Sequence, residues 1–390
     1  MSDSRIEFLS LEQLATHRSE KWRGFPADVI PLPVAEMDFP LAEPIKKLLH
    51  SMVESSDMGY LGPIPELGNA FAGFAKTRWS WVVDPTKVRV ATDVGVGVVE
   101  VLRVFTNPGD SILVSSPVYQ NFYTWINETK LQLVDVPFIY NPSTDISTSW
   151  SIDWDGIEKA YQSGIKVHLL CSPHNPNGRM YTKQELEKFI ELALANNVII
   201  ISDEIHSPLE YSDHPFTPIL ALGDKAAECS VVVTAASKGW SIAGLKCAII
   251  VSGNDRMHER LNSLPPALHF RASIFGAFAT AVAFSESVTW LDTVIKQLDS
   301  NRYLVATLLK EHLPEVIYNP PQHSYLAWLD VTALNLGVDP GATIIEKSKV
   351  AFNSGHIYGP QWNQFVRLNF ATSPEIISQA IIQIGKTIRG

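Results

Sequence analysis

The middle of the chain alternates short apolar runs with segments of helical pattern, and this alternation limits the possible folds more than any other feature. The runs are rich in β-branched or other apolar residues and cover residues 112–115, 166–171, 198–202, 231–234 and 247–251. Continuous apolar runs of this length are typical of strands buried on both faces of a parallel sheet. The pattern therefore predicts an α/β region, with a mostly parallel sheet covered by helices, over residues 46–280.

One of the intervening segments carries a complete helix signature. Thr182 is followed three residues later by Glu185, which is the spacing of a capping box. Apolar residues then recur at helical spacing along one face: Leu186, Phe189, Ile190, Ala193 and Leu194. We therefore expect a helix here that packs its apolar stripe against the sheet.

After Pro265 and Pro266 the short, continuously apolar runs give way to a different pattern. A long helical stretch is followed by two segments, 326–330 and 365–370, that read as alternating, half-exposed strands. The ending P-E-I-I-S-Q-A-I-I-Q-I-G-K reads as a closing helix. We expect a second, smaller α+β domain made of residues 281–390 together with the N-terminal segment 1–45.

Composition narrows the class of protein. The chain is 46% hydrophobic and 18% charged, which is the composition of a folded globular protein. Its net charge of −10 disfavours nucleic acid as a partner, because phosphate binding needs a basic face. No apolar run approaches the roughly 20 residues that span a bilayer, and the N-terminal residues lack the apolar region of a signal peptide. Three widely spaced cysteines argue against a disulfide framework, so we expect a cytoplasmic protein without a membrane partner.

Polar residues follow three of the apolar runs, at the position where open α/β sheets bind their ligands. S-P-H-N-P-N-G-R follows the run 166–171 and contains Asn175. D-E-I-H, which begins at Asp203 and ends at His206, follows 198–202, and A-A-S-K, which ends at Lys238, follows 231–234. Three strand ends thus supply an amide, a carboxylate with an imidazole, and an amine.

These residue types suit one cofactor chemistry. A lysine amine is costly to bury as an ammonium, but as a Schiff base with an aldehyde it carries no such cost. A carboxylate such as Asp203 can keep a pyridine nitrogen protonated, as pyridoxal phosphate needs when it acts as an electron sink. Asn175 can donate to the ring's phenolic oxygen. The stretch T-D-V-G-V-G-V-V-E offers a helix start for the phosphate, although Glu100 excludes a dinucleotide fingerprint.

Each residue alone also has an ordinary structural explanation. Lys238 could be a solvated turn lysine, Asp203 a helix cap and Asn175 a turn residue. His206 could be a core histidine and Arg367 a member of a surface ion pair. Single tyrosines such as Tyr119 and Tyr60 more often pack than bind. The histidines show no metal-ligand spacing, so we expect no metal site.

Four motifs in order remove most of this ambiguity. P-H-N-P-N-G-R, D-E-I-H, S-K-G-W-S-I-A-G-L and F-V-R-L-N-F resemble the asparagine, aspartate, lysine and arginine motifs of fold-type I pyridoxal-phosphate enzymes, in the aminotransferase class I/II superfamily. The resemblance covers nearly the whole chain. It implies a large domain with a mostly parallel, seven-stranded sheet covered by helices, and a smaller α+β domain.

The resemblance also implies roles for individual residues. Lys238 would hold the cofactor and later act as the base, Asp203 would pair with the pyridine nitrogen, and Asn175 would contact the ring oxygen. Tyr119 would stack on the ring, and Arg367 would clamp the substrate's α-carboxylate with its guanidinium fork. Further cofactor contacts are implied for His206, for the N–H groups of Val96 and Gly97, for Ser237 and Lys246, and for Tyr60 of a neighbouring subunit in a homodimer.

Other segments resemble the cystathionine β-lyase branch, also called cysteine C–S lyases. They are P-L-P-V-A-E-M-D-F-P, H-S-Y-L-A-W-L-D and D-E-I-H, which has His206 where aminotransferases carry a tyrosine. Lys246 also stands where aminotransferases place a phosphate-binding arginine. The branch implies β-elimination from cystathionine or a related cysteine S-conjugate to a thiol, pyruvate and ammonia. An aminotransferase of the same fold and a non-catalytic dimer remain the alternatives.

Overall fold

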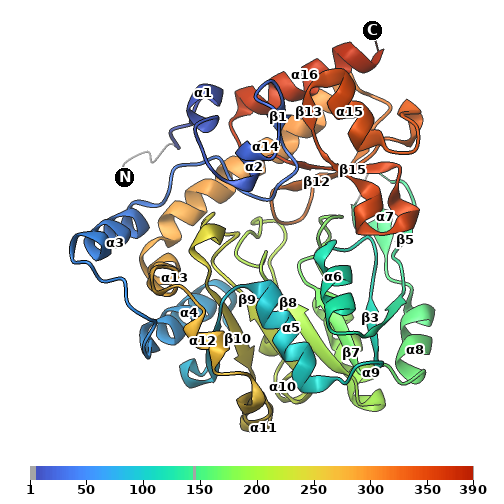
Figure 1. Cartoon of the computed structure of the whole chain (residues 1–390). Helices are drawn as coiled ribbons and strands as arrows, with labels where there is room; N and C mark the ends of the chain where they lie inside the picture. Colours follow the sequence, from blue (N-terminus) through green and yellow to red (C-terminus); the bar gives the residue numbers. More distant parts are fainter. Residues whose placement is uncertain (1–5, 144–145, 390) are drawn as a thin grey trace.

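The computed structural model describes residues 6–143 and 146–389, and its centre is a seven-stranded sheet (Figure 1). The strands run in the order β2 (Val88–Ala91), β10 (Ala248–Ser252), β9 (Ser230–Thr234), β8 (Ile199–Asp203), β7 (Val167–Cys171), β3 (Ser111–Val114) and β4 (Gln132–Asp135). All neighbouring pairs from β9 to β4 are parallel, whereas β10 runs antiparallel to β9 and β2. The expected sheet is confirmed, and each predicted apolar run lies on one of its strands.

Helices cover both faces of this sheet, which explains why its strands are continuously apolar. On β9, Val231 and Val233 pack towards α5 (Val94–Phe105) and α6 (Asn121–Glu128), while Val232 faces the opposite side. That side is covered by α4 (Pro65–Trp79), α8 (Trp154–Gln162), α9 (Lys183–Asn196), α10 (Asp224–Cys229) and α13 (Ile274–Glu286). The predicted capping box of α9 is present, with Thr182 and Glu185 bonding reciprocally.

A smaller sheet lies at the C-terminal end of the chain (Figure 1). Its order is β11 (Ile317–Tyr318), β12 (Leu326–Asp330), β15 (Phe365–Asn369) and β14 (Asn353–Ser354), and all pairs are antiparallel. The long helix α14 (Val288–His312), α15 (Pro340–Ser348) and α16 (Pro374–Arg389) pack together beside it. The closing helix is therefore confirmed.

The prediction that β12 and β15 are half-exposed is wrong, because every residue of both strands is buried. The alternation of apolar and polar residues in β15 is real, but its polar side does not face solvent. Arg367 and Asn369 instead point to the backbone of an N-terminal segment and donate hydrogen bonds to it. Polar alternation in this strand marks a contact surface inside the molecule.

That N-terminal segment, residues 33–38, is called the strap below. Just before it, β1 (Ile30–Pro31) pairs in parallel with β13 (Val350–Ala351). At its end, the Asp38 carboxylate accepts from Lys21 Nζ at 2.6 Å, and both side chains are buried. Asp38 also accepts from Trp22 Nε1 at 3.0 Å, and its N–H donates to the carbonyl of Ala371. The strap is thus fixed at both ends.

The remaining elements are short or lie at the periphery. They are α1 (Leu11–Leu14), α2 (Glu20–Arg23), α3 (Glu43–Glu54), α7 (Ile146–Ser149), α11 (Asp255–Arg260), α12 (Ala267–Phe270) and the hairpin of β5 (Ile139–Tyr140) and β6 (Trp150–Ser151). The predicted domain limits at 45/46 and 280/281 fall inside α3 and α13. Among the described residues no single helix is long and apolar enough to span a membrane, and only α13 and α14 taken together, bent by 77°, meet that test of length and composition.

Candidate active site

Three of the predicted site residues follow neighbouring parallel strands at one edge of the large sheet. Asp203 is the last residue of β8, Asn175 lies in the loop after β7, and Lys238 lies in the turn after β9. Since parallel strands end at the same edge, the sheet itself brings the amide, the carboxylate and the amine together. Arg367 of β15 joins them from the small sheet, with its Nη1 donating to Asn175 Oδ1 at 3.0 Å.

Lys238 has an unusual environment for a lysine. Its Nζ donates to the carbonyl of Ala35 in the strap at 2.9 Å, and no carboxylate lies within ion-pair distance among the described residues. Burial, together with the charge of Arg367, lowers the pKa of the Lys238 amine to about 8. A substantial share of this amine is therefore uncharged near neutral pH, as a nucleophile or base requires.

Asp203 is a buried carboxylate whose single recorded side-chain partner is the N–H of Ile205, at 3.1 Å from Oδ1. Burial raises the pKa of Asp203 to about 7, although the Ile205 N–H and the Lys238 charge act in the opposite direction. A buried carboxylate with so few partners fits a cationic ring nitrogen as the missing one. The donor set of this site therefore fits pyridoxal phosphate.

Each terminal nitrogen of Arg367 donates to one fixed acceptor, and its Nε donates to none in the described part of the chain. Its Nη1 donates to Asn175, its Nη2 donates to the carbonyl of Pro33 at 2.8 Å, and its Nε is buried without a partner. A buried donor left unpaired is costly unless a ligand completes it. The contact with Asn175 Oδ1 also turns the amide so that its N–H₂ group faces elsewhere and remains available to donate.

The strap supplies backbone acceptors to this site, which side-chain motifs could not reveal. Besides Lys238 and Arg367, Tyr325 donates to the Ala35 carbonyl at 3.0 Å, and Asn353 donates to the Pro33 carbonyl at 3.0 Å. Asn369 donates to the carbonyls of both Val34 and Glu36 at 2.6 Å. The strap therefore holds the cationic side chains in place.

Tyr119 lies between the charged groups of the site. It follows β3, is partly buried, and its hydroxyl accepts from Asn121 Nδ2 at 2.8 Å. Burial raises the pKa of its phenol, which also experiences the charges of Arg367, Asp203 and Asp93. A partly buried aromatic ring that experiences the charges of Asp203 and Asp93 is compatible with stacking on a bound cofactor.

The N-terminus of α5 differs from the prediction. The Val96 N–H donates to Asp93 Oδ1 at 2.9 Å, and the Gly97 N–H donates to the Asp93 carbonyl. In the part of the chain that the structure describes, the N–H groups left without a partner are those of Val94 and Gly95, the first two helical residues. An N-cap side chain occupies the N–H of the third helical residue, so Val94 and Gly95 join the candidates for binding an anion, while the roles of Val96 and Gly97 stay a prediction.

Asp93 also forms an ion pair with Lys246, the predicted phosphate ligand. Lys246 Nζ lies 3.0 Å from Asp93 Oδ2, and both side chains are partly exposed. Ser237, directly before Lys238, is partly exposed, and its hydroxyl has no recorded hydrogen bond among the described residues. The prospective phosphate site thus contains a carboxylate that motif comparison did not identify.

This carboxylate leads to a prediction about cofactor affinity. We expect Asp93→Asn to bind pyridoxal phosphate about two- to fivefold more tightly at low salt, because Asn still caps α5 while the repulsion between two anions is removed. Absorbance titration of cofactor-stripped protein measures this. Asp84→Asn is the matched control, since Asp84 also caps a helical turn and pairs with a lysine, Lys87, outside the site. Weaker binding by Asp93→Asn would contradict the prediction.

His206 is buried behind Asp203, and its Nδ1 lies 3.0 Å from Ser324 Oγ. Burial and the neighbouring charges of Lys238 and Arg367 hold its pKa well below the ordinary value, so the imidazole is neutral. Tyr60 is different, because it is 89% exposed in the loop between α3 and α4 and contacts none of the other predicted site residues of its own chain.

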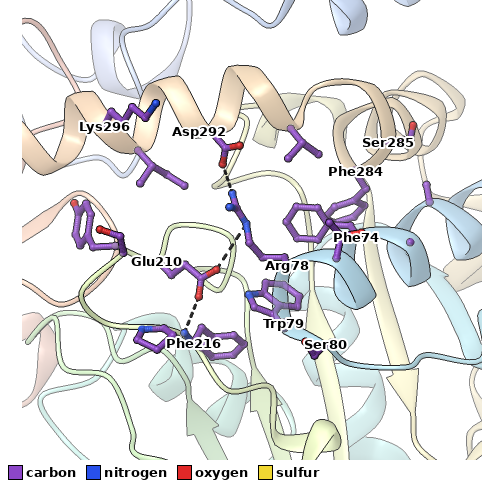
Figure 2. A pocket seen from close by; sticks show the side chains of 18 of the residues that line it. Phe74, Arg78, Trp79, Ser80, Glu210, Phe216, Phe284, Ser285, Asp292 and Lys296 are labelled. Atoms are coloured by element: carbon purple, nitrogen blue, oxygen red, sulfur yellow. Dashed lines mark hydrogen bonds and ion pairs between the residues drawn. The ribbon is translucent and has the colours of Figure 1, made fainter.

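A cavity of about 1160 Å³ lies outside this site (Figure 2). It is formed by α4, the loop 210–216 and the α13–α14 pair, and Arg78 extends into it between Asp292 and Glu210. None of the predicted site residues lines it. We place the chemistry at the sheet edge, where the titratable groups with shifted pKa values gather, and not in this cavity.

Sequence reasoning missed three features: the strap carbonyls, Asp93 and Ser324. Asp93 could have been found, since an aspartate directly before a glycine-containing helix start is a capping signal. The strap was noticed as a motif, but its contribution is made by backbone oxygens, which every residue has. Ser324 lies in the quoted segment H-S-Y-L-A-W-L-D, but nothing in that segment indicates its contact with His206.

Known proteins resemble this chain over nearly its full length. The model of the family "Aminotransferase class I and II" matches residues 27–384. Cystathionine beta-lyase of Corynebacterium glutamicum is 32% identical over 98% of this chain and 100% of its own, and cystathionine beta-lyase PatB of Bacillus subtilis is 31% identical over 98% of both. The crystal structure of cystalysin from Treponema denticola, which contains a pyridoxal 5'-phosphate cofactor, has a TM-score of 0.91 at 26% identity, covering 100% of this chain and 99% of the other.

Proposed function

The chain belongs to the aminotransferase class I and II family, and we propose that within it this protein is a pyridoxal-phosphate-dependent C–S β-lyase. Its substrate would be cystathionine or a related cysteine S-conjugate, which it converts to a thiol, pyruvate and ammonia. The observation that carries the proposal is the meeting of Lys238, Asp203 and Arg367 at one edge of the sheet, in a chain whose full-length relatives are named cystathionine beta-lyase.

We propose that each group has one task in the elimination. Pyridoxal phosphate, when bound, supplies an electron sink that stabilises negative charge at the substrate's α-carbon. Asp203 keeps the proton on the ring nitrogen. Arg367 binds the α-carboxylate, using donors that the strap and Asn175 hold in a fixed orientation. Lys238 Nζ takes the α-proton, and the C–S bond then breaks with the electron pair leaving on sulfur.

The lowered pKa of Lys238 supports its assignment as the base. A general base works best when its pKa lies near the working pH, and burial has already moved this amine to about 8. Once the Lys238 amine is released from the cofactor, only its uncharged form can accept the α-proton, because the protonated form has no free electron pair. The amine's contribution to the rate therefore rises as the pH increases through that value and levels off above it.

The substrate proposal predicts a defined product pattern. We expect purified protein loaded with pyridoxal phosphate to release pyruvate and free thiol from cystathionine in equal amounts, with no keto acid added. Lactate dehydrogenase coupling measures the pyruvate, and a thiol reagent measures the thiol. The Lys238→Ala protein serves as the control for uncatalysed breakdown. Amino-group transfer that needs a keto acid, without thiol release, would favour the aminotransferase alternative.

We also propose that the enzyme is a cytoplasmic homodimer with shared active sites. Tyr60, Met58 and Phe270 are large side chains that are 89%, 58% and 59% exposed, and such exposure favours burial against a second copy of the chain. Tyr60 would then reach the phosphate site of the neighbouring subunit.

The free, buried thiols of Cys171, Cys229 and Cys247 suit a reducing compartment. The division into domains 46–280 and 1–45 with 281–390 stays a proposal, supported by the pairing of β1 with β13.

A further inference from the structure

Ser324 makes a hydrogen bond to the imidazole of His206 that the proposed chemistry does not yet use. Its Oγ lies 3.0 Å from His206 Nδ1, and both residues are buried, 1% and 2% exposed. Ser324 directly precedes Tyr325 and β12, whereas His206 follows β8, so the contact joins the small sheet to the large one. A contact of this kind can decide which ring nitrogen of a histidine carries the proton.

The backbone at Ser324 is held in a conformation that side chains rarely adopt. Its φ is +67°, in the left-handed region that favours glycine. Two hydrogen bonds keep it there, because its N–H donates to the carbonyl of Leu209 at 2.9 Å and its own carbonyl accepts from the hydroxyl of Tyr211. Non-glycine residues persist in this region when the surrounding structure enforces it, and such positions gather at functional sites.

The loop that carries His206 is fixed from its outer side as well (Figure 2). The Glu210 carboxylate accepts from the Phe216 N–H at 2.6 Å and lies 3.7 Å from Arg78 Nε. Glu210 also forms an isolated antiparallel bridge with His323, the residue before Ser324. The Ser324–His206 contact is thus the inner part of a rigid connection, not a chance approach of two mobile side chains.

The direction of the hydrogen bond follows from counting donors. If His206 Nδ1 carried the proton and Ser324 accepted it, the serine's own hydroxyl proton would need another acceptor, and none is recorded among the described residues. A buried donor without an acceptor costs free energy. If Ser324 donates to Nδ1, its proton is satisfied and the ring proton must lie on Nε2, which has no recorded partner in the described part of the chain.

We propose that Ser324 is a positioning residue that holds His206 as the neutral Nε2–H tautomer, so that His206 donates to the phenolic oxygen of the cofactor ring. The inference rests on the proposed function, because that oxygen belongs to pyridoxal phosphate. Asn175 is set in the same way, since Arg367 occupies its Oδ1 and leaves its N–H₂ group free to donate. Two neutral donors, each oriented by a second residue, then serve one acceptor.

Neutral donors suit this location. Lys238 and Arg367 already place positive charge around His206, and the rings of His323 and Tyr325 lie beside it, with centroids 6.1 Å and 6.2 Å away. A third cation there would be repelled, while a neutral N–H stabilises an anionic oxygen without that repulsion. Burial keeps His206 neutral, and Ser324 determines which of the two neutral forms is present.

The ring proton can be located directly in the full-length holoenzyme. We expect magic-angle-spinning NMR of protein labelled with ¹⁵N-histidine to show His206 protonated on Nε2, with the His206→Gln protein assigning the signal. Ser324→Gly removes the hydroxyl but tolerates the positive φ, and we expect it to give a mixture of tautomers. Ser324→Asn keeps a side-chain donor and tolerates the positive φ, and it should retain more of the Nε2–H form than Ser324→Gly. Ser80→Gly is the matched control, because Ser80 also has a positive φ, +55°, and lies away from the site.

The second measurement is the visible absorbance of the holoenzyme as a function of pH. Loss of one donor makes the ring oxygen more basic, so we expect Ser324→Gly to raise the midpoint of the absorbance change by about one pH unit, while Ser80→Gly leaves it unchanged and Ser324→Asn shifts it less than Ser324→Gly. A proton on Nδ1 in the unsubstituted protein would refute the inference, and so would a Ser324→Gly protein with unaltered tautomer and midpoint. The tautomer is read whether or not cystathionine is cleaved, so this result is independent of the substrate proposal.

Discussion

Replacing Lys238 by alanine should reduce kcat/KM by at least about 10²–10⁴-fold, equivalent to roughly 3–5 kcal/mol of barrier. The reason is that Lys21, whose amine contacts the next strap carbonyl, that of Glu36, is held in a buried ion pair with Asp38, and no other amine contacts the Ala35 carbonyl in the described part of the chain. The variant should also lose covalent attachment of the cofactor. Borohydride reduction followed by peptide mapping measures the attachment, and pyruvate release from cystathionine measures the rate. The reference is the unsubstituted protein, in which we expect borohydride to modify the peptide that contains Lys238.

Lys246→Ala is the matched control, because it removes a lysine amine from the same connection between β9 and β10, at the residue that pairs with Asp93. It should weaken cofactor binding but leave borohydride labelling intact at saturating cofactor.

The Lys238→Ala protein also tests the proposed dimer. Mixed with Tyr60→Ala protein and allowed to exchange subunits, it should form hybrid dimers that contain one intact site and regain part of the activity. Full activity in Lys238→Ala would overturn the assignment of the site.

Asp203→Asn should have opposite effects on activity and on stability. Without the carboxylate the ring nitrogen loses its proton, and we expect kcat to fall by roughly 10²–10³-fold, the usual effect of removing one electrostatic stabiliser. The cofactor-free variant should nevertheless be more stable than the unsubstituted protein at pH 8. Asn keeps the oxygen that accepts from Ile205 and removes a charge from a buried position.

The sign of the stability effect follows from the pKa of Asp203. Burial raises it from 3.8 to about 7 in the folded protein, so ionisation opposes folding. The stability present below about pH 4 is lost progressively as the pH rises to about 7, and the three-unit difference corresponds to about 4 kcal/mol. Urea denaturation of the cofactor-free proteins at pH 4 and pH 8 measures this. The cofactor-free Asp203→Asn protein should have a higher free energy of unfolding than the unsubstituted protein at pH 8, and the two should be equal at pH 4.

Glu204→Gln is the control for this experiment. Glu204 is the adjacent residue, is 1% exposed, and has a pKa raised by burial to about 8. Both of its recorded hydrogen bonds, from Ser202 and Ile219, go to Oε1, which Gln can retain. We expect a similar gain in stability at high pH without the loss of activity. A Glu204→Gln enzyme as impaired as Asp203→Asn would show that the charge matters to the fold and not to the ring.

Much of the large domain could be predicted because its strands are buried on both faces and its helices carry caps. The apolar runs that end at Asp203 and before Lys238 identified their strands, and Thr182 with Glu185 identified α9. The small sheet was harder to predict. Arg367 and Asn369 produce the alternation of an exposed strand, and only the position of the strap shows that this side of β15 is covered.

The candidate site could be predicted where a side chain's type decides its chemistry, as for Lys238 and Asp203. It could not be predicted where a backbone group or a local conformation decides which contact is made. The free N–H groups at the start of α5 belong to Val94 and Gly95 because Asp93 occupies the next one, which depends on a single side-chain rotamer. The positive φ of Ser324 likewise depends on Leu209 and Tyr211, which are remote in sequence.

The strap has a consequence for how the enzyme is made. Arg367 Nη2 and the Pro33 carbonyl that it contacts are 334 positions apart in the chain. A nascent chain that has just emerged from the ribosome with Lys238 has its first residues but not yet β15, so the strap lacks the contacts that Arg367 and Asn369 make with it. Contacts between such distant positions form late in folding. Maturation with the cofactor is therefore a step that follows synthesis of the whole polypeptide, and a chain cut short near its end keeps its lysine in a site that never closes.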